Sequence, residues 1–197
     1  MVETGRLPGA VVGTETSGMV FNGSSGYRKQ EAASDPRAAW IFAGTKEGDV
    51  FGADYGIDKV HGAVAGLEID RYNARNGVPR HALVLAASEA LKPKVEDVKL
   101  EPLPLSIAYH PSDKEMWAKA NMVFFETPNG GAVLATGSIA WMGSVVANNF
   151  NNDVATITKN VVKRFLDPKP FPAIQASQVE SFDRLPSNPD YEWADQH

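Results

Sequence analysis

The chain has 197 residues, 43% of them hydrophobic and 22% charged, which indicates a folded globular protein with one ordinary domain or two very small ones. It has no cysteine, which excludes disulfides, cysteine-ligated zinc, iron–sulfur clusters and a Cys–His nucleophile. The net charge of −5 argues against nucleic acid as a partner, and the longest apolar runs are too short to span a membrane. No secretory signal is visible, so we expect a cytoplasmic location.

The N-terminal part of the sequence predicts little regular structure. Residues 1–39 are rich in glycine and turn-forming residues, and we interpret them as an irregular segment that packs against something else. Trp40–Gly44 is a short strand candidate that ends at a glycine. Two further strands are expected at Ala63–Asp70 and His81–Ala87. The unbroken apolar run of the second is typical of a strand that is buried on both faces.

The most regular pattern begins at residue 122. Two β-like runs, 122–127 and 132–139, flank the turn 128–131 (Pro-Asn-Gly-Gly) and predict a β-hairpin. A helix should follow, with Asn152 as its N-cap and Pro168 just beyond its end. The apolar residues of this helix recur at helical spacing and form one stripe: Val154, Ile157, Val161 and Phe165.

The C-terminal residues differ from the rest in charge and composition. Residues 167–197 carry 6 acidic and 2 basic residues, together with five prolines and four aromatic residues. This composition predicts either a disordered acidic terminus or an extended arm that lies along a partner or along the chain's own body. The expected organisation is therefore an irregular segment (1–39), a sheet domain (40–167) and a proline-rich acidic tail (168–197).

Together these elements indicate an α/β or α+β sheet domain. Only the final helix is strongly predicted, so few helices are available to cover both faces of the sheet. We therefore expect an incomplete domain, finished by another chain or by sequence that this chain lacks.

Few motifs in the sequence carry recognisable chemistry. No phosphate-binding loop is found, and none of the four histidines is paired at metal-binding spacing, so no residue is assigned as a metal ligand. Ser138 follows a strand but lacks the G-x-S-x-G pattern, so a turn hydroxyl bonded to local backbone is the favoured interpretation over a nucleophile. Tyrosines could supply phenolates, but each is more typical of a packing residue: Tyr27, Tyr55, Tyr72 and Tyr109.

Carboxylates provide the best candidates for a site. Glu89 follows the strand 81–87, and ligands gather at the carboxyl ends of strands in open α/β sheets, so Glu89 is the candidate catalytic acid or base. Glu68 and Asp70 end another strand and lie on one face of it. Asp70 and Tyr27 are the candidate substrate-binding residues, although Asp70 could instead form a structural ion pair with Arg71.

Several stretches, in collinear order over roughly residues 10–167, resemble the C-terminal region of the N,N-dimethylformamidase large (beta) subunit. They are 23–28, 35–42, 66–71, 81–86, 124–141 and 152–165. The resemblance implies a glutamine-amidotransferase-like or flavodoxin-like sheet without Cys–His–Glu machinery. It also implies hydrolysis of the C–N bond of small amides by a mononuclear iron held by two tyrosines and a glutamate. Those ligands lie upstream of the matching region, which implies no cofactor in this chain and iron in a companion chain.

The leading hypothesis is a truncated or split C-terminal domain of a dimethylformamidase-like amide hydrolase, with companion subunits completing the site for a small amide. One alternative is a non-catalytic structural or binding subunit that reuses this scaffold in another assembly. A third is a self-sufficient hydrolase that uses Glu89 with a carboxylate or histidine partner.

Overall fold

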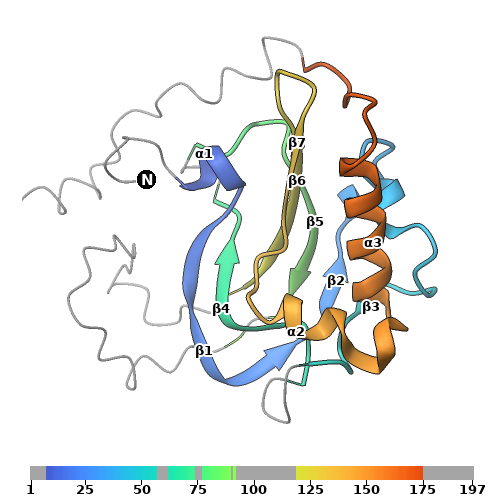
Figure 1. The fold of residues 1–197 in the computed structure, drawn as a ribbon. Helices are drawn as coiled ribbons and strands as arrows, with labels where there is room; N and C mark the ends of the chain where they lie inside the picture. The colour runs from blue at the N-terminus through green and yellow to red at the C-terminus, as the bar shows by residue number, and fades with distance from the viewer. Residues whose placement is uncertain (1–7, 57–61, 74–76, 90, 92–118, 175–197) are drawn as a thin grey trace, which may run out of the picture.

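The computed structural model describes residues 8–56, 62–73, 77–89, 91 and 119–174 (Figure 1). Within them the chain forms short helices and antiparallel strands, an α+β arrangement. The helices are α1 (Pro8–Val12), η2 (Glu31–Ser34), η3 (Ala39–Phe42), α2 (Trp141–Val145), η6 (Ala147–Phe150) and α3 (Asp153–Phe165). The strands are β1 (Glu15–Ser25), β2 (Tyr27–Lys29), β3 (Val50–Phe51), β4 (Ala65–Arg71), β5 (Leu83–Ser88), β6 (Asn121–Glu126) and β7 (Ala132–Ala135).

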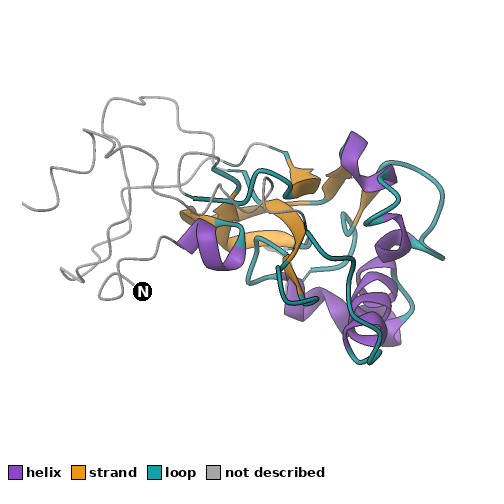
Figure 2. Cartoon of the chain, turned by 90° about the horizontal axis from the view of Figure 1, so that it is seen from above, coloured by secondary structure: helices purple, strands orange, loops and turns teal. Residues whose placement is uncertain are grey.

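The strands form two sheets. Five of them are ordered β3-β2-β5-β6-β7, with every neighbouring pair antiparallel, and β1 pairs with β4 in a separate two-stranded ribbon. Helix α3 lies on one side of the five-stranded sheet and the β1–β4 ribbon lies on the other (Figure 1). Seen from above, α1 and α3 also lie on opposite sides of the strands (Figure 2). The ribbon and α1 therefore cover the face that has no long helix on it.

Strand β6 shows why both sheet faces are buried. Residues Met122 to Phe125 are at most 1% exposed, and successive side chains of a strand point to opposite faces. The ring of Phe124 packs edge-on against Trp40 of η3, on the α3 side. The side chains of Val123 and Phe125 lie against Gly13, where a Cβ atom would come within 2.9 Å of the Phe125 ring. A single strand thus joins the two layers of the core.

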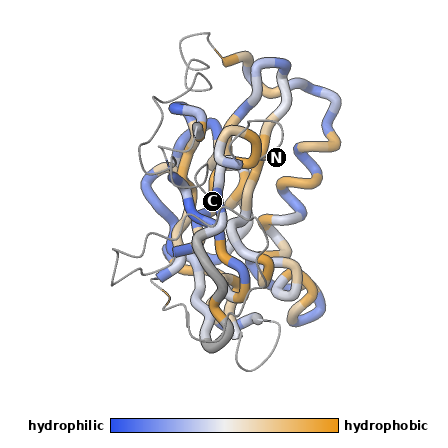
Figure 3. The backbone as a smooth tube through the Cα atoms, turned by 90° about the vertical axis from the view of Figure 1, so that its left-hand side faces the viewer, coloured by the Kyte–Doolittle hydropathy of each residue, from blue (hydrophilic) through white to orange (hydrophobic). Residues whose placement is uncertain are grey.

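The predicted hairpin and helix are confirmed. Strands β6 and β7 pair around a turn in which Thr127 N–H donates to Gly131 O, and Gly130 adopts φ +79°. Helix α3 begins after Asn152, whose side chain accepts a hydrogen bond from Ala155 N–H at 2.8 Å. Hydrophobic and hydrophilic residues alternate around its turns (Figure 3).

The apolar stripe of α3 is buried in its first half more than in its second. Val154 and Ile157 are fully buried, while Val161 is half-buried against the core. Phe165 is 43% exposed and packs edge-on against the ring of Phe171. The predicted core stripe is therefore confirmed for Val154 and Ile157, holds in part for Val161, and does not extend to Phe165.

Three local predictions are wrong. Residues 1–39 are not an irregular segment, because they contain β1 and β2, and β2 lies inside the five-stranded sheet. Trp40–Gly44 is not a strand: η3 ends at Phe42, and Ala43 N–H donates to Trp40 O in the turn that follows. Strand β5 is not buried on both faces along its whole length, since Leu83 and Val84 are half-buried.

The antiparallel pairing decides between the two expected fold classes. Each ladder among the described residues is antiparallel, so the structure supports α+β, and the glutamine-amidotransferase-like or flavodoxin-like arrangement is not confirmed. Ligands gather at the carboxyl ends of strands in parallel sheets, because these ends share one edge there. In this antiparallel sheet, the end of a strand is therefore no evidence for a ligand site.

The first residues of the predicted tail lie on the body of the domain. Phe171 packs against Trp40, Phe124 and Phe165, and its N–H donates to Gly130 O at 2.8 Å. The Arg164 guanidinium stacks on the Phe171 ring at 3.8 Å. Residues 175–197 lie outside the described residues, so the arm itself stays a prediction. Over the part of the chain that is described, no helix has the length and apolar character needed to cross a bilayer.

Candidate functional site

Tyr27, a predicted substrate-binding residue, lies at the centre of the core. Its ring stacks on Phe51 and meets Trp141 edge-on, and none of its surface is exposed. Its hydroxyl donates to Thr136 O at 2.6 Å, which satisfies the buried donor. Burial, together with the nearby Asp70 carboxylate, raises the pKa of Tyr27 far above its ordinary value. This phenol is therefore a neutral donor that is fully used inside the domain.

Asp70 lies close to Tyr27 on strand β4. Its carboxylate is half-buried, and burial raises its pKa. The charge of Glu68 adds to this increase, while a hydrogen bond from Thr16 opposes it. The structure therefore brings two of the predicted site residues together, Tyr27 and Asp70, with Glu68 beside them. The alternative ion pair is not formed, because Arg71 pairs with Glu15 at 3.1 Å.

The segment 136–139 joins these residues. Thr136 O accepts from Tyr27, Gly137 O accepts from Asp70 N–H at 2.9 Å, and Ile139 N–H donates to Glu68 O at 3.1 Å. Gly137 has φ +70°, and a Cβ atom there would come within 2.3 Å of Asn121 O. Only glycine fits this crossing of two backbones. The segment thus fixes β4 against the core.

Ser138 serves the same crossing. Its Oγ accepts from Gly66 N–H and donates to Gly66 O, both at 3.0 Å, and it also accepts from Ala140 N–H. The side chain is buried. Ser138 thus bonds backbone groups, as predicted, but only the bond to Ala140 is local; the other two reach Gly66, 72 positions away.

Glu89 follows Ser88, the strand partner of Tyr27, but its side chain makes none of the bonds of this cluster. Its side chain is exposed at the end of β5, and the hydrogen bonds recorded for it use its backbone: its N–H donates to Ser25 Oγ, and its O accepts from Ser88 Oγ. The sheet is antiparallel at this point, so the strand-end argument that selected Glu89 does not apply. A catalytic role for Glu89 stays a prediction without support from its surroundings.

Sequence reasoning missed an ion pair between a half-buried arginine and a buried glutamate. Arg37 donates from Nε and Nη2 to both carboxylate oxygens of Glu126, which is 4% exposed, and Nη2 also donates to His81 O. The His81 ring completes the group by bonding Glu126 O at 2.9 Å. The two charged residues are 89 positions apart, so no local pattern could pair them. The bidentate geometry neutralises a buried carboxylate and anchors the 30–42 region to the sheet.

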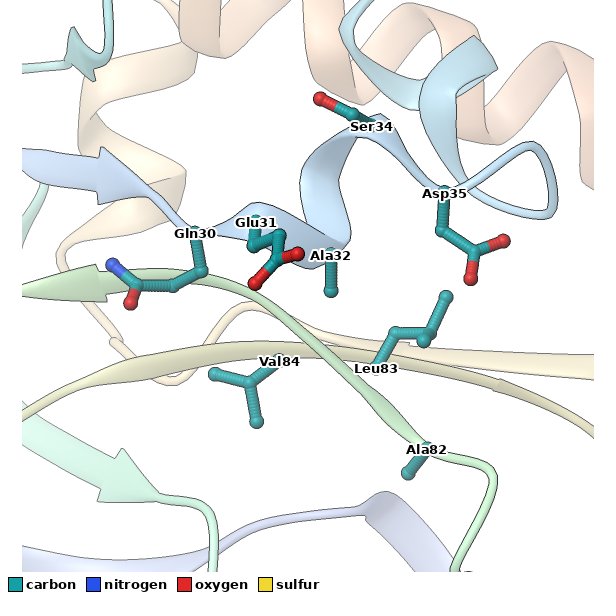
Figure 4. A pocket seen from close by; sticks show the side chains of 8 residues that line it. All are labelled: Gln30, Glu31, Ala32, Ser34, Asp35, Ala82, Leu83 and Val84. Atoms are coloured by element: carbon teal, nitrogen blue, oxygen red, sulfur yellow. The ribbon is translucent and has the colours of Figure 1, made fainter.

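An open depression lies over η2 and the start of β5. Its volume is about 640 Å³, and Gln30, Glu31, Ser34 and Asp35 line one side, opposite Leu83 and Val84 (Figure 4). Asp35 Oδ1 accepts from Arg37 N–H, which gives this carboxylate a structural use. The depression shares no residue with the Tyr27–Asp70 cluster.

The Tyr27–Asp70 cluster does not suit the tyrosine-and-glutamate iron ligation that the family resemblance implies. Among the described residues, no group of three or more histidine, aspartate or glutamate side chains could hold a metal ion. Tyr27, close to Asp70, donates its proton to a backbone carbonyl, and its raised pKa opposes the phenolate form. The cluster is suited to holding a backbone crossing in place.

Comparisons with known proteins give a consistent result. Residues 4–153 match the family described as N,N-dimethylformamidase beta subunit-like, C-terminal. Two N,N-dimethylformamidase beta subunits, from Paracoccus aminophilus and from an Alcaligenes species, are each 34% identical over 173 residues. The alignments cover 86% of this chain but 22% of each relative, so the chain spans about a fifth of the length of the curated relatives it matches. The chain belongs to the N,N-dimethylformamidase beta subunit-like, C-terminal family.

Proposed function

We propose that this chain is the C-terminal domain, or a split subunit, of an N,N-dimethylformamidase-like amide hydrolase. It supports hydrolysis of a linear amide C–N bond at a site that residues outside this chain complete. The single observation that carries the proposal is the family match, which covers most of this chain and about a fifth of each relative. Iron in the companion part is a component of the same proposal.

The chemistry of the described residues supports an auxiliary role, in which the domain assists the reaction but does not hold the metal. Tyr27 and Ser138, which both bond at the 136–139 crossing, use their hydroxyls on backbone groups, and Thr16 bonds the Asp70 carboxylate. The half-buried Asp70 carboxylate, whose pKa burial raises, is the group best placed to meet a ligand or a partner. The domain thus contributes a rigid support with one carboxylate near its surface, and the companion part contributes the metal and the substrate pocket.

A second candidate is a non-catalytic subunit that uses this scaffold only for assembly. It is favoured by the same hydroxyl bonding, because hydroxyl groups that bond the domain's own backbone need no substrate as a partner. The two candidates differ in whether the Asp70 carboxylate matters for hydrolysis.

A chimera tests the proposal. Residues 4–153 of this chain replace the matching region of the Paracoccus aminophilus beta subunit, and the complete enzyme is assayed for dimethylamine released from N,N-dimethylformamide. We expect a folded chimera that retains activity within about tenfold of the parent, whereas Gly137→Val, which blocks the backbone crossing, abolishes it. Elemental analysis should find iron in the chimera and no stoichiometric iron or zinc in this chain alone.

Two outcomes separate the candidates. A folded, iron-containing chimera without hydrolysis contradicts the proposal. An active chimera whose rate is unchanged by Asp70→Asn favours the purely structural subunit, while a loss of tenfold or more in kcat without a fall in Tm assigns this carboxylate a part in the reaction.

A further inference from the structure

One continuous stretch of the chain exposes large apolar side chains. Ile139, Met142, Val146 and Phe150 are 56%, 71%, 57% and 63% exposed, and we call them the 139–150 surface. They recur every three or four residues along the chain: Ile139 lies just before α2, Met142 within it, Val146 between α2 and η6, and Phe150 at the end of η6. In α2 itself, Trp141 and Ser144 are buried. The segment therefore packs on the core with some of its side chains and exposes these four apolar ones.

The composition around this surface is that of a protein interface. No charged residue occurs from 127 to 152, although 22% of the whole chain is charged. The centres of protein–protein interfaces are depleted in charged residues and enriched in methionine and aromatic residues. Exposed apolar patches on soluble proteins mark sites of interaction. An uncharged surface also excludes the electrostatic contacts on which nucleic acids and charged peptides depend.

The backbone under Phe150 is strained. Asn148, Asn149 and Phe150 are consecutive and have φ of +50°, +53° and +63°. The left-handed conformation costs a non-glycine residue roughly 1–2 kcal/mol, and asparagine tolerates it better than phenylalanine does. Residues held in this way concentrate at functional sites, where the surrounding structure enforces them.

Asn152 enforces the strained turn. Its Nδ2 donates to Ser144 O at 3.2 Å and Ala147 O at 2.7 Å, while its Oδ1 caps α3. Asn148 Nδ2 adds a bond to Asn151 O. These bonds stabilise a turn in which the ring of Phe150 is exposed to solvent. The strained backbone therefore does not serve to bury this ring in the core.

The 139–150 surface is continuous with the Asp70 cluster. Its first member, Ile139, bonds Glu68 O through its N–H, two residues after Gly137 accepts from Asp70 N–H. A protein seated on this surface would therefore border the Glu68 and Asp70 carboxylates.

We propose that the 139–150 surface binds the part of a beta-subunit-like protein that this chain does not contain. The inference rests on the proposed function. The lengths of the relatives indicate the occupant. The 139–150 surface lies inside the family match at 4–153, and about four-fifths of each relative lies outside its alignment with this chain. That remaining part is therefore the protein surface available to cover it. The complementary surface on that part is apolar and uncharged. A second copy of this chain and an unrelated partner are the competing occupants.

Amide hydrogen exchange in the chimera tests the inference, because protection does not depend on activity. We expect residues 139–150 to exchange at least tenfold more slowly in the chimera than in the isolated chain. Met142→Glu should remove this protection. The matched control is Val50→Glu, which changes an exposed apolar residue of β3, also inside the grafted residues, and should leave the protection intact.

The remaining outcomes are decisive. Equal exchange in a folded chimera and the isolated chain overturns the inference, even if the chimera is active. Protection in the isolated chain that grows with its concentration, together with a dimer in sedimentation, assigns the surface to a second copy instead.

If the chimera does not fold, a photo-crosslinking residue is placed at position 142 of this chain, which is then mixed with the Paracoccus aminophilus beta subunit lacking its matched region. A crosslink from position 142 but not from position 50 supports the inference, and no crosslink from either contradicts it.

Discussion

Two successive helical regions, α2 with η6 and then α3, carry apolar residues at the same spacing but place them in opposite surroundings. In α3, Val154 and Ile157 are fully buried against the sheet, and Asn160 ties the helix to η3 through Ile41 O and Ala43 O. In α2 and η6, the spaced residues Met142, Val146 and Phe150 face solvent.

The difference shows what a helical pattern establishes. A stripe of apolar residues at a period near 3.6 predicts that one face avoids water, but the pattern does not say what covers that face. The stripe of α3 is covered by the domain's own sheet. The 139–150 surface is not covered by the described residues, and the backbone strain beside it indicates that its exposure is maintained by the structure.

The largest difference is expected when one charge is placed in each of the two helical regions. Val154→Asp buries an unpaired carboxylate, so it should lower the free energy of unfolding by about 3–5 kcal/mol or prevent folding. Val146→Asp, at a 57% exposed valine, should change it by less than about 1 kcal/mol. Urea titration of the isolated chain measures both. Similar losses for the two variants would show that the surfaces do not differ in the way described.

Asn152 holds the two regions together, and its removal should have the next largest effect. Asn152→Ala deletes the cap of α3 and leaves buried carbonyl groups of the preceding turn without a donor, so we expect a loss of about 2–3 kcal/mol. Asn151→Ala, at the neighbouring exposed asparagine, is the control and should cost less than about 0.5 kcal/mol. Equal losses would show that Asn152 has no special role.

Phe150→Gly tests the strain directly and should change stability in the opposite direction. Glycine adopts φ near +60° without a steric cost, so the isolated chain should gain about 1 kcal/mol in spite of losing a large side chain. Ala147→Gly is the control: its φ is not left-handed, and it should lose about 0.5–1 kcal/mol. A loss of stability for Phe150→Gly, measured by thermal melting, would mean that the ring contributes more to the isolated fold than the strain costs.

The smallest expected effect is a pH dependence at Asp70, next to the exposed surface. Burial raises the pKa of this carboxyl, so the folded state binds its proton more tightly than the unfolded state, where the pKa is about 3.9. The ionised form therefore costs stability above the raised pKa, and this cost disappears as the pH falls toward 4. Asp70→Asn should raise Tm at pH 7 by a small amount and lose that gain at pH 4. A gain that is equal at both values would exclude ionisation as its cause.

The parts of the fold that could be predicted depend on neighbouring residues. The hairpin has its turn residues between two apolar runs, and α3 has its cap, its dipole-matched charges and its stop within a few positions of one another. Strand β1 has no such signal: it contains two glycines and several small polar residues, and its extended form depends on pairing with β4, some fifty residues away. Glycine-rich sequence alone favours turns, so the sequence predicts an irregular segment at 1–39 where the structure has β1 and β2.

The candidate site was harder to predict for the same reason. Tyr27 and Asp70 were selected separately, and only the tertiary structure shows that the 136–139 crossing places them together. Glu89 was selected by a rule for parallel sheets, and the sequence of one strand does not reveal the direction of its neighbours. The 139–150 surface was open to sequence reasoning, since the uncharged run and its spaced apolar residues are both local features.

The order of strands in the five-stranded sheet bears on how the domain folds. The pair β6–β7 closes over a short turn and α3 follows soon after, while β2 must find β5 across more than fifty residues of intervening chain. Short loops close at a lower entropic cost than long ones, so the C-terminal hairpin and helix are expected to assemble first and to serve as the template on which β2 and the β1–β4 ribbon dock. During synthesis from the N-terminus, that template emerges after β2 and β5, so the edges of these strands that pair with each other or with β6 are at risk of wrong contacts until the hairpin forms.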